Sequence, residues 1–146
     1  MNKKKILFLT GAAGDIGQSI AKYFNAHDWD VIGLDKNMPR NKKNFLHFEK
    51  VDLLTFVSDS SYQKDVLAHF NSLCKKLSTI DCLINNAAIQ VAKPSFKLTG
   101  EDFETSFRVN SIAPFLLCSY FYKQLLANKG NIINISSIHS KLTLQD

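Results

Sequence analysis

The chain has 146 residues, of which 45% are hydrophobic, which predicts one domain over residues 1–146 with a core of its own. No apolar run reaches the ~18–20 residues of a membrane span or suits a signal peptide, so we expect a cytoplasmic protein without a membrane partner. The net charge is +5, but the basic residues are not interleaved with aromatic residues as on a nucleic-acid-binding surface. This argues against a nucleic-acid partner.

The first candidate site is the stretch from Ile6 to Gly17, in which four apolar residues run into a turn with three glycines. Gly11 allows a sharp break after the strand, Gly14 allows the backbone to approach a ligand, and Gly17 allows the next helix to pack closely. The helix that begins here presents unpaired N–H groups and the positive end of its dipole. The turn therefore predicts a pyrophosphate site.

A helix and a second strand follow the turn. The spacing of Ile16, Ile20 and Phe24 predicts a helix to about residue 26, and residues 31–35 read as a strand. The last residue of this strand, Asp35, stands ~20 positions after the glycines. An acidic side chain at this position accepts hydrogen bonds from an adenosine ribose.

The remaining elements alternate in the same way. Residues 36–44 have no apolar period, so we expect a loop or single turn where related folds carry a helix. The other predicted elements are a strand over 45–53, a helix capped by Ser58, Ser60 or Ser61 with the stripe Val66, Phe70, Leu73 and Leu77, a strand over 80–85, a helix from Thr99 or Gly100 to Asn128 that Gly130 ends, and a strand over 131–137.

This alternation predicts an α/β fold, a doubly wound, Rossmann-like parallel sheet of five strands with a shortened crossover between strands two and three. Ligands of such sheets bind outside the carboxyl ends of the strands. The polar clusters of this chain fall at those ends: residues 10–17, Asp35, Asp52, Asn85-Asn86 and Ser136-Ser137.

The three cysteines are Cys74, Cys82 and Cys118. They are scattered and odd in number, so their spacing predicts neither a disulfide framework nor a metal site. We expect them to act as small apolar residues, and we expect no metal, because no zinc spacing is present.

Together the motifs resemble those of the short-chain dehydrogenase/reductase family, and the resemblance covers the whole chain. Residues 10–17 resemble its glycine loop, Asp52-Leu53 the pair that contacts adenine, and residues 85–88 the motif that braces the central strand. Val109-Asn110 resembles the segment of the active-site asparagine, and residues 134–137 the strand that ends in the catalytic serine. The implied cofactor-binding residues are Gly11, Gly14, Asp15, Ile16, Gly17, Asp35, Asp52, Leu53, Asn86, Ala87 and Ala88.

The resemblance implies an oxidoreductase that transfers a hydride between NAD(H) and a small carbonyl or alcohol substrate. Asp35 favours NAD over NADP, because a carboxylate pairs with a 2′-hydroxyl and repels a 2′-phosphate, although Lys36 and Arg40 stand nearby. The implied catalytic residues are Asn110 and Ser137. Ser137 would hold the substrate oxygen.

Three further expectations concern the surroundings of these residues. Pro114 has no N–H, so it leaves the carbonyl of Asn110 free to hold a water, unless the proline merely kinks the helix. Gln90 and His139 are candidates for the substrate pocket. Asp15, in the first turn of a helix, should point away from a pyrophosphate.

Two departures from the family pattern leave alternatives open. Gly14 stands one place earlier than the second glycine of the usual loop, as in extended, epimerase-like members. The tyrosine–lysine pair of the family would stand near position 150, beyond Asp146. If Asp146 is the terminus, we expect a non-catalytic dinucleotide-binding protein that self-associates; otherwise we expect an enzyme that forms a homodimer or homotetramer through its long helix.

Overall fold

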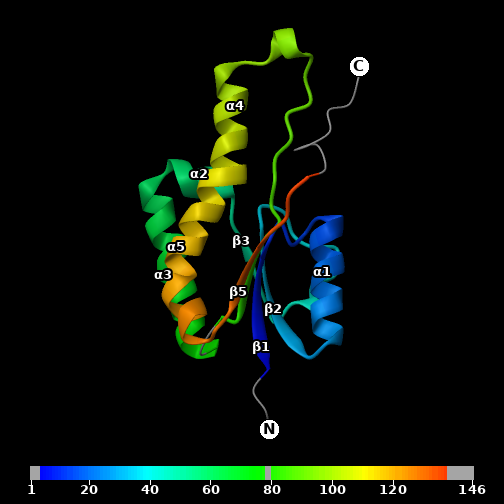
Figure 1. Cartoon of the computed structure of the whole chain (residues 1–146), viewed down its shortest axis with the longest axis vertical. Helices are drawn as coiled ribbons and strands as arrows, with labels where there is room; N and C mark the ends of the chain where they lie inside the picture. Colours follow the sequence, from blue (N-terminus) through cyan, green and yellow to red (C-terminus); the bar gives the residue numbers. More distant parts are fainter. Residues whose placement is uncertain (1–3, 78–79, 138–146) are drawn as a thin grey trace.

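The computed structural model describes residues 4–77 and 80–137. A five-stranded parallel sheet lies between two layers of helices, which confirms the predicted Rossmann-like α/β fold (Figure 1). The strand order is β3-β2-β1-β4-β5, so the chain winds outward in both directions from β1. The strands are β1 (Lys5–Thr10), β2 (Trp29–Asp35), β3 (His47–Lys50), β4 (Cys82–Asn85) and β5 (Asn131–Asn134).

Both faces of the sheet are covered. Helix α1 (Asp15–Ala26) lies on one face, and α2 (Leu53–Ser58), α3 (Ser60–Leu77) and α5 (Ala113–Ala127) lie on the other (Figure 1). Successive residues of β1 alternate between two cores, because side chains in a strand point to opposite faces. Leu7 packs in the core under α1, whereas Phe8 contacts Phe70 and Phe121 on the other face.

The crossover between β2 and β3 is short, as predicted. It holds only the 3₁₀ turn η1 (Lys42–Asn44), whose N-cap Asn41 accepts a hydrogen bond from the N–H of Lys43. Two phenylalanine rings, Phe45 and Phe48, cover this part of the sheet in place of a helix. A Cβ on Gly33 would lie only 2.7 Å from atoms of both rings, which is too close for a side chain at this position. Gly33 therefore leaves room for the two rings, which meet edge to face with 74° between their planes.

The predicted bounds of the third strand and of the helix after it were wrong. β3 ends at Lys50, and Asp52 caps a separate helix, α2, through Oδ1, which accepts from the N–H groups of Leu54 and Thr55. Asp59 caps α3 in the same way. Aspartates perform the role expected of Ser58, Ser60 or Ser61, because one carboxylate oxygen accepts two N–H groups at once.

The predicted long helix is interrupted. It begins with a capping box in which Thr99 and Asp102 bond each other's backbone, and continues as α4 (Gly100–Phe107), the π-helical segment η3 (Arg108–Ile112) and α5. Lys93 donates a hydrogen bond to Asp102 at 2.7 Å, and the N–H of Thr99 donates a second one. These two hydrogen bonds lower the pKa of the Asp102 carboxyl. The N–H of Ala113 donates to the carbonyl of Arg108, five residues back. This wide turn precedes Pro114 and accommodates its missing donor.

Gly130 has a different role from the one predicted. The left-handed residue that ends α5 is Lys129, with φ +52°. Gly130 instead allows a close approach, because a Cβ there would lie 2.5 Å from the carbonyl oxygen of Asp81.

Three other strand ends differ from the predicted positions. β2 begins two residues earlier than predicted, at Trp29; β4 begins two later, at Cys82; and β5 ends at Asn134. The N–H of Ile135 still donates to the carbonyl of Asn85 at 2.9 Å, so the pairing of β5 extends slightly past its end. Ile16 was predicted to share the apolar stripe of α1, but its side chain is 61% exposed.

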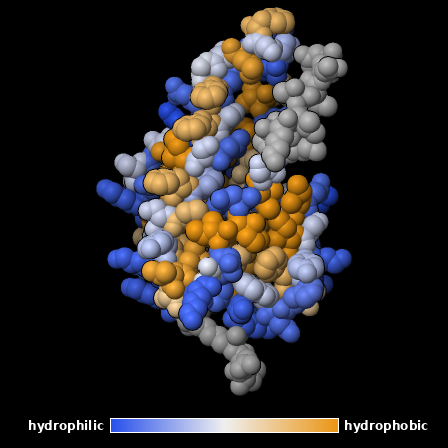
Figure 2. All heavy atoms as spheres, in the orientation of Figure 1, coloured by the Kyte–Doolittle hydropathy of each residue, from blue (hydrophilic) through white to orange (hydrophobic). Residues whose placement is uncertain are grey.

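The strand β5 forms one edge of the described sheet and pairs with β4 alone. Figure 2 shows hydrophobic side chains gathered along it, and Ile132, Ile133 and Ile135 are exposed. These three isoleucines therefore give this edge of the described sheet an apolar surface. In the part of the chain that the structure describes, no helix combines the length and the apolar character that crossing a membrane requires.

The capping of α3 provides a test of this architecture. Asp59→Ala should lower the free energy of unfolding by about 1 kcal/mol, because two N–H groups of α3 lose their acceptor. Ser61→Ala, at an exposed position in the same turn, should leave it unchanged within about 0.5 kcal/mol. Urea denaturation measures both, and a larger loss for Ser61→Ala would show that the serine caps the helix.

Candidate functional site

A cleft of about 680 Å³ opens at the carboxyl ends of the strands. Its lining comes from the segments that directly follow β1, β2, β3 and β4, together with Val109 of η3. Such a volume lies within the range of about 300–1,000 Å³ typical of small-molecule sites. Ten of the eleven residues that the sequence assigned to a cofactor line it: Gly11, Gly14, Asp15, Ile16, Asp35, Asp52, Leu53, Asn86, Ala87 and Ala88.

The turn after β1 depends on Gly11, whose φ of +64° lies in the left-handed region. A Cβ at this position would lie 2.8 Å from the backbone N and Cα of Ala87. Hence no side chain fits between the turn and the segment after β4. This close approach joins two of the segments that form the cleft.

The remaining glycines of the turn differ in their surroundings. Gly14 is the N-cap of α1, and a Cβ there would make only an ordinary contact, at 3.5 Å, with the carbonyl oxygen of Gly11. At Gly17 a Cβ would lie 2.1 Å from that same oxygen. Gly17 is buried and lies outside the cleft lining, so its role is to pack α1 against the turn.

No side chain of residues 4–77 or 80–137 caps the start of α1. The first N–H groups of this 12-residue helix therefore face the cleft without a side-chain acceptor. Together with the helix dipole they favour an anion at this position.

The buried side chain of Thr10 holds the turn against the end of β4. Its hydroxyl oxygen accepts hydrogen bonds from the N–H groups of Asn86 and Ala87, both at 3.0 Å. The Asn86 amide in turn donates to the carbonyls of Thr10 and Gly11, both at 3.1 Å. Four hydrogen bonds thus join β1 to β4 beside the cleft. Local sequence carries no sign of these bonds of Thr10, because the partners lie 76 and 77 positions away.

Both oxygens of Asp35 bind the backbone of the cleft wall. Oδ2 accepts from the N–H of Ala13 at 3.0 Å, and Oδ1 accepts from the N–H of Asn37 at 2.9 Å. The carboxylate therefore connects the glycine turn to the end of β2. Each oxygen retains a lone pair with which it can accept one further hydrogen bond from a ligand.

Two cations line the cleft near Asp35, namely Lys36 and Arg40. Arg40 lies 3.5 Å from Asp15, and both side chains are highly exposed. Asp15 stands in the first turn of α1, as expected from the helix dipole. An exposed pair of this kind contributes little to stability, about 0–1 kcal/mol.

The predicted catalytic residues lie outside the cleft lining. The amide of Asn110 donates to the carbonyl of Ile89 and accepts from its N–H, both at 2.8 Å, so it holds the loop after β4 to η3. Ser137 follows β5 and is exposed, as is Gln90 in the loop after β4. His139 lies outside the described residues. Ile89 itself lines the cleft, so Asn110 acts on the cleft wall through the backbone.

Two of the three thiols are buried in the core. Burial raises the pKa of Cys74, and burial together with the neighbouring charge of Asp81 raises the pKa of Cys82 to about 11. Both therefore stay protonated at neutral pH and pack as small apolar groups, as expected.

The sheet and its glycine turn define a Rossmann-like nucleotide-binding domain. A model of the short chain dehydrogenase family matches residues 5–145, and the chain belongs to this family. Its relatives include an L-fucose dehydrogenase of Oryctolagus cuniculus, 28% identical over 92% of this chain and 47% of the relative. An uncharacterized oxidoreductase of Bacillus subtilis is 30% identical over 94% of this chain and 54% of its own length.

Solved structures agree with this assignment. A short chain dehydrogenase of Leptospira borgpetersenii with bound NAD⁺ is 27% identical, with a TM-score of 0.79 over 94% of this chain and 53% of that one. A 4-hydroxyisoleucine dehydrogenase complexed with NADH is 28% identical, with a TM-score of 0.77 over 97% and 59%. The chain thus spans about half the length of the curated relatives.

Substitutions at two glycines test the local geometry of the turn. Gly17→Ala should lower the free energy of unfolding by about 1–3 kcal/mol, because its Cβ overlaps the backbone of Gly11. The matched variant Gly14→Ala has room and an ordinary φ, so its stability should stay within about 1 kcal/mol of the parent. Thermal or urea denaturation measures both, and equal losses would contradict this description of the turn.

Proposed function

We propose that this chain binds NAD(H) in the cleft and that its protein transfers a hydride between NAD(H) and a small carbonyl or alcohol substrate, in the cytoplasm. The observation that carries the proposal is the placement of the glycine turn, the uncapped start of α1 and Asp35 on one cleft. The solved relatives that hold NAD⁺ or NADH support it.

The residues of the cleft fit the parts of a dinucleotide. The pyrophosphate would lie against the N–H groups at Asp15 and Ile16, where negative charge is favoured. The ribose of the adenosine would bond Asp35, and the adenine would lie beside Asp52 and Leu53. The segment Asn86–Ala88 would form the opposite wall.

Asp35 also supports the choice of NAD over NADP. Its carboxylate is held at the end of β2 by two backbone N–H groups, so it cannot easily turn away from a ribose. A 2′-phosphate there would meet a fixed negative charge.

The bound cofactor would supply the hydride acceptor or donor, and the chain would position the substrate. Ser137 would hold the substrate oxygen by a hydrogen bond as charge develops on it. Asn110 would act as a positioning residue, because its amide holds the backbone of Ile89 at the cleft wall. The non-catalytic alternative gains no support from the relatives named as dehydrogenases.

We further propose that the protein forms a homodimer or homotetramer through the outer face of α4 and α5. Helix α5 buries Leu117, Phe121 and Leu125 on its inner face. On its outer face Phe115 is 69% exposed, and on α4 the exposed rings of Phe103 and Phe107 stack, with centroids 6.2 Å apart. A helix that is apolar on both faces is typical of one with a partner on its outer side.

The cofactor proposal is tested by Asp35→Ala. Loss of the carboxylate should weaken NAD⁺ binding by about 1–3 kcal/mol, or roughly 5–150-fold in Kd, because the ribose hydroxyls lose their acceptor. NADP⁺ should lose less affinity, because a repulsion disappears as well. Isothermal titration with each dinucleotide measures the two effects.

A matched aspartate serves as the control. Asp30 belongs to the same strand but lies at its amino end, near Lys4, so Asp30→Ala should bind NAD⁺ as the parent does. Equal NAD⁺ affinity in Asp35→Ala and the parent would contradict the assignment of Asp35. Equal losses for NAD⁺ and NADP⁺ would mean that the carboxylate acts only by holding the turn.

The assembly proposal is tested by Phe115→Glu. A charge on the outer face of α5 should shift the protein toward monomer, because it would be desolvated in the interface. Phe96→Glu is the control, since Phe96 is 85% exposed in the loop before α4. Light scattering reports the mass of each variant, and an unchanged oligomer in Phe115→Glu would place the interface elsewhere.

A further inference from the structure

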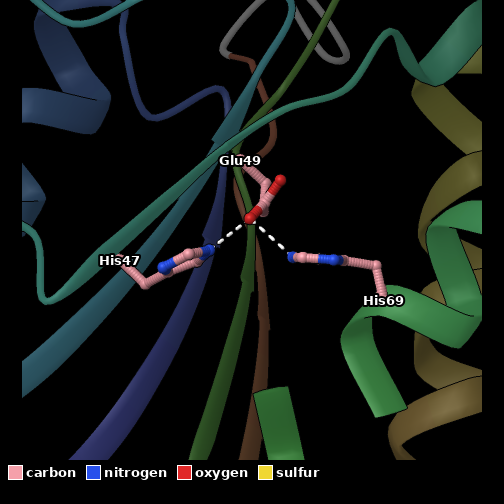
Figure 3. A group of neighbouring side chains, drawn as sticks. All are labelled: His47, Glu49 and His69. Carbon is pink, nitrogen blue, oxygen red and sulfur yellow. Dashed lines mark hydrogen bonds and ion pairs between the residues drawn. The ribbon is translucent and has the colours of Figure 1, made fainter. Parts of the chain in front are cut away.

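Three potential metal ligands meet at the free edge of the sheet beside β3. His47 and Glu49 stand two positions apart on β3, so they project from the same face of the strand, and His69 reaches them from α3 (Figure 3). The two imidazoles point toward a single carboxylate. His69 Nε2 lies 2.7 Å from Glu49 Oε1, and His47 Nε2 contacts the same oxygen.

The geometry of these atoms suits a small cation. One ligand atom from each of the three side chains lies within 4.8 Å of the other two. Donor atoms on a tetrahedral Zn²⁺, at bond lengths of about 2.0–2.1 Å, lie about 3.3 Å apart. Small rotations of the side chains would therefore bring all three donors to one ion. The two imidazole rings, with centroids 6.0 Å apart, already direct their Nε2 atoms at Glu49 from opposite sides (Figure 3).

The chemistry of the donors narrows the choice of ion. Imidazole nitrogen and carboxylate oxygen together favour zinc and its neighbours among the divalent transition metals over Ca²⁺ or Mg²⁺, which prefer oxygen alone. The side chains of His69, His47 and Glu49 are 51%, 35% and 22% exposed. An ion can thus enter from solvent, and water can complete its coordination.

We propose that His47, Glu49 and His69 bind a divalent transition-metal ion, with Zn²⁺ as the probe, at a site separate from the dinucleotide cleft. None of the three residues lines that cleft. The ion would join β3, a four-residue edge strand that pairs only with β2, to α3. Its effect would be to stabilise the edge from which the chain continues to Asp52 and the cleft.

The competing explanation is a hydrogen-bonded His–Glu–His cluster without an ion. In that cluster each imidazole donates a proton to Glu49, whereas a metal replaces both protons. The two arrangements can be distinguished by experiment. Only a metal site binds one ion per chain, and only a metal site loses that ion when one of the three donor side chains is removed.

The first experiment titrates purified, untagged protein with Zn²⁺ alone by calorimetry. The parent should bind one ion per chain, and His69→Gln and Glu49→Gln should bind it about tenfold or more weakly. His27→Gln is the matched control, because His27 is exposed at the end of α1 and its ring contacts Tyr23, away from the cluster. Circular dichroism checks that each variant is folded, and His47→Asn replaces any variant that is not.

The second experiment uses two readouts that hydrogen bonding alone would not move. Zn²⁺ should raise the Tm of the parent and of His27→Gln, but not that of His69→Gln, because an ion bound only by the folded state stabilises it. Co²⁺ should give visible d–d bands in the parent that His69→Gln lacks. Folded parent that binds no Zn²⁺, or equal binding by His69→Gln and His27→Gln, would overturn the proposal.

Discussion

The cleft depends above all on the contact between the turn after β1 and the end of β4. Thr10 and Asn86 exchange four hydrogen bonds with the backbone on either side, and Gly11 removes the side chain that would keep the segments apart. Because the turn is held in this way, α1 begins at a defined point with its N–H groups facing the cleft. Gly17 then packs α1 so closely on the turn that no methyl group fits between them.

Asp35 connects the same turn to β2 on the other side. Its two oxygens hold Ala13 and Asn37, and Asp35 also lines the cleft. One carboxylate thus positions the glycine turn, and in the function proposed above it would also distinguish a 2′-hydroxyl from a 2′-phosphate. Arg40 pairs with Asp15 across this part of the cleft instead of neutralising Asp35.

The five strands followed from the sequence, whereas the separate helix α2 and several element ends did not. Hydrophobic periodicity and glycine punctuation indicated five strands in the right order and the short crossover. The caps were misassigned because Asp52, Asp59 and the nearby serines are all good N-cap residues. Only the path of the chain decides which side chain meets the free N–H groups. The π-helical turn before Pro114 likewise could not be predicted from the sequence, because a proline indicates an irregularity in a helix without specifying its form.

By itself the sequence determined the fold class, the glycine turn and the gathering of Asp35, Asp52 and Asn86 at one cleft, because these depend on local spacing and on the rule that parallel strands carry ligands at their carboxyl ends. Only the tertiary structure decided what joins those residues. Thr10 and Asn86 stand 76 positions apart in the sequence. Asn110 and Ile89 are separated by 21 positions, and His69 and Glu49 by 20. Such pairs leave no periodic signal, since their distance in space is decided by how β4, α3 and η3 pack on the sheet rather than by their separation along the chain.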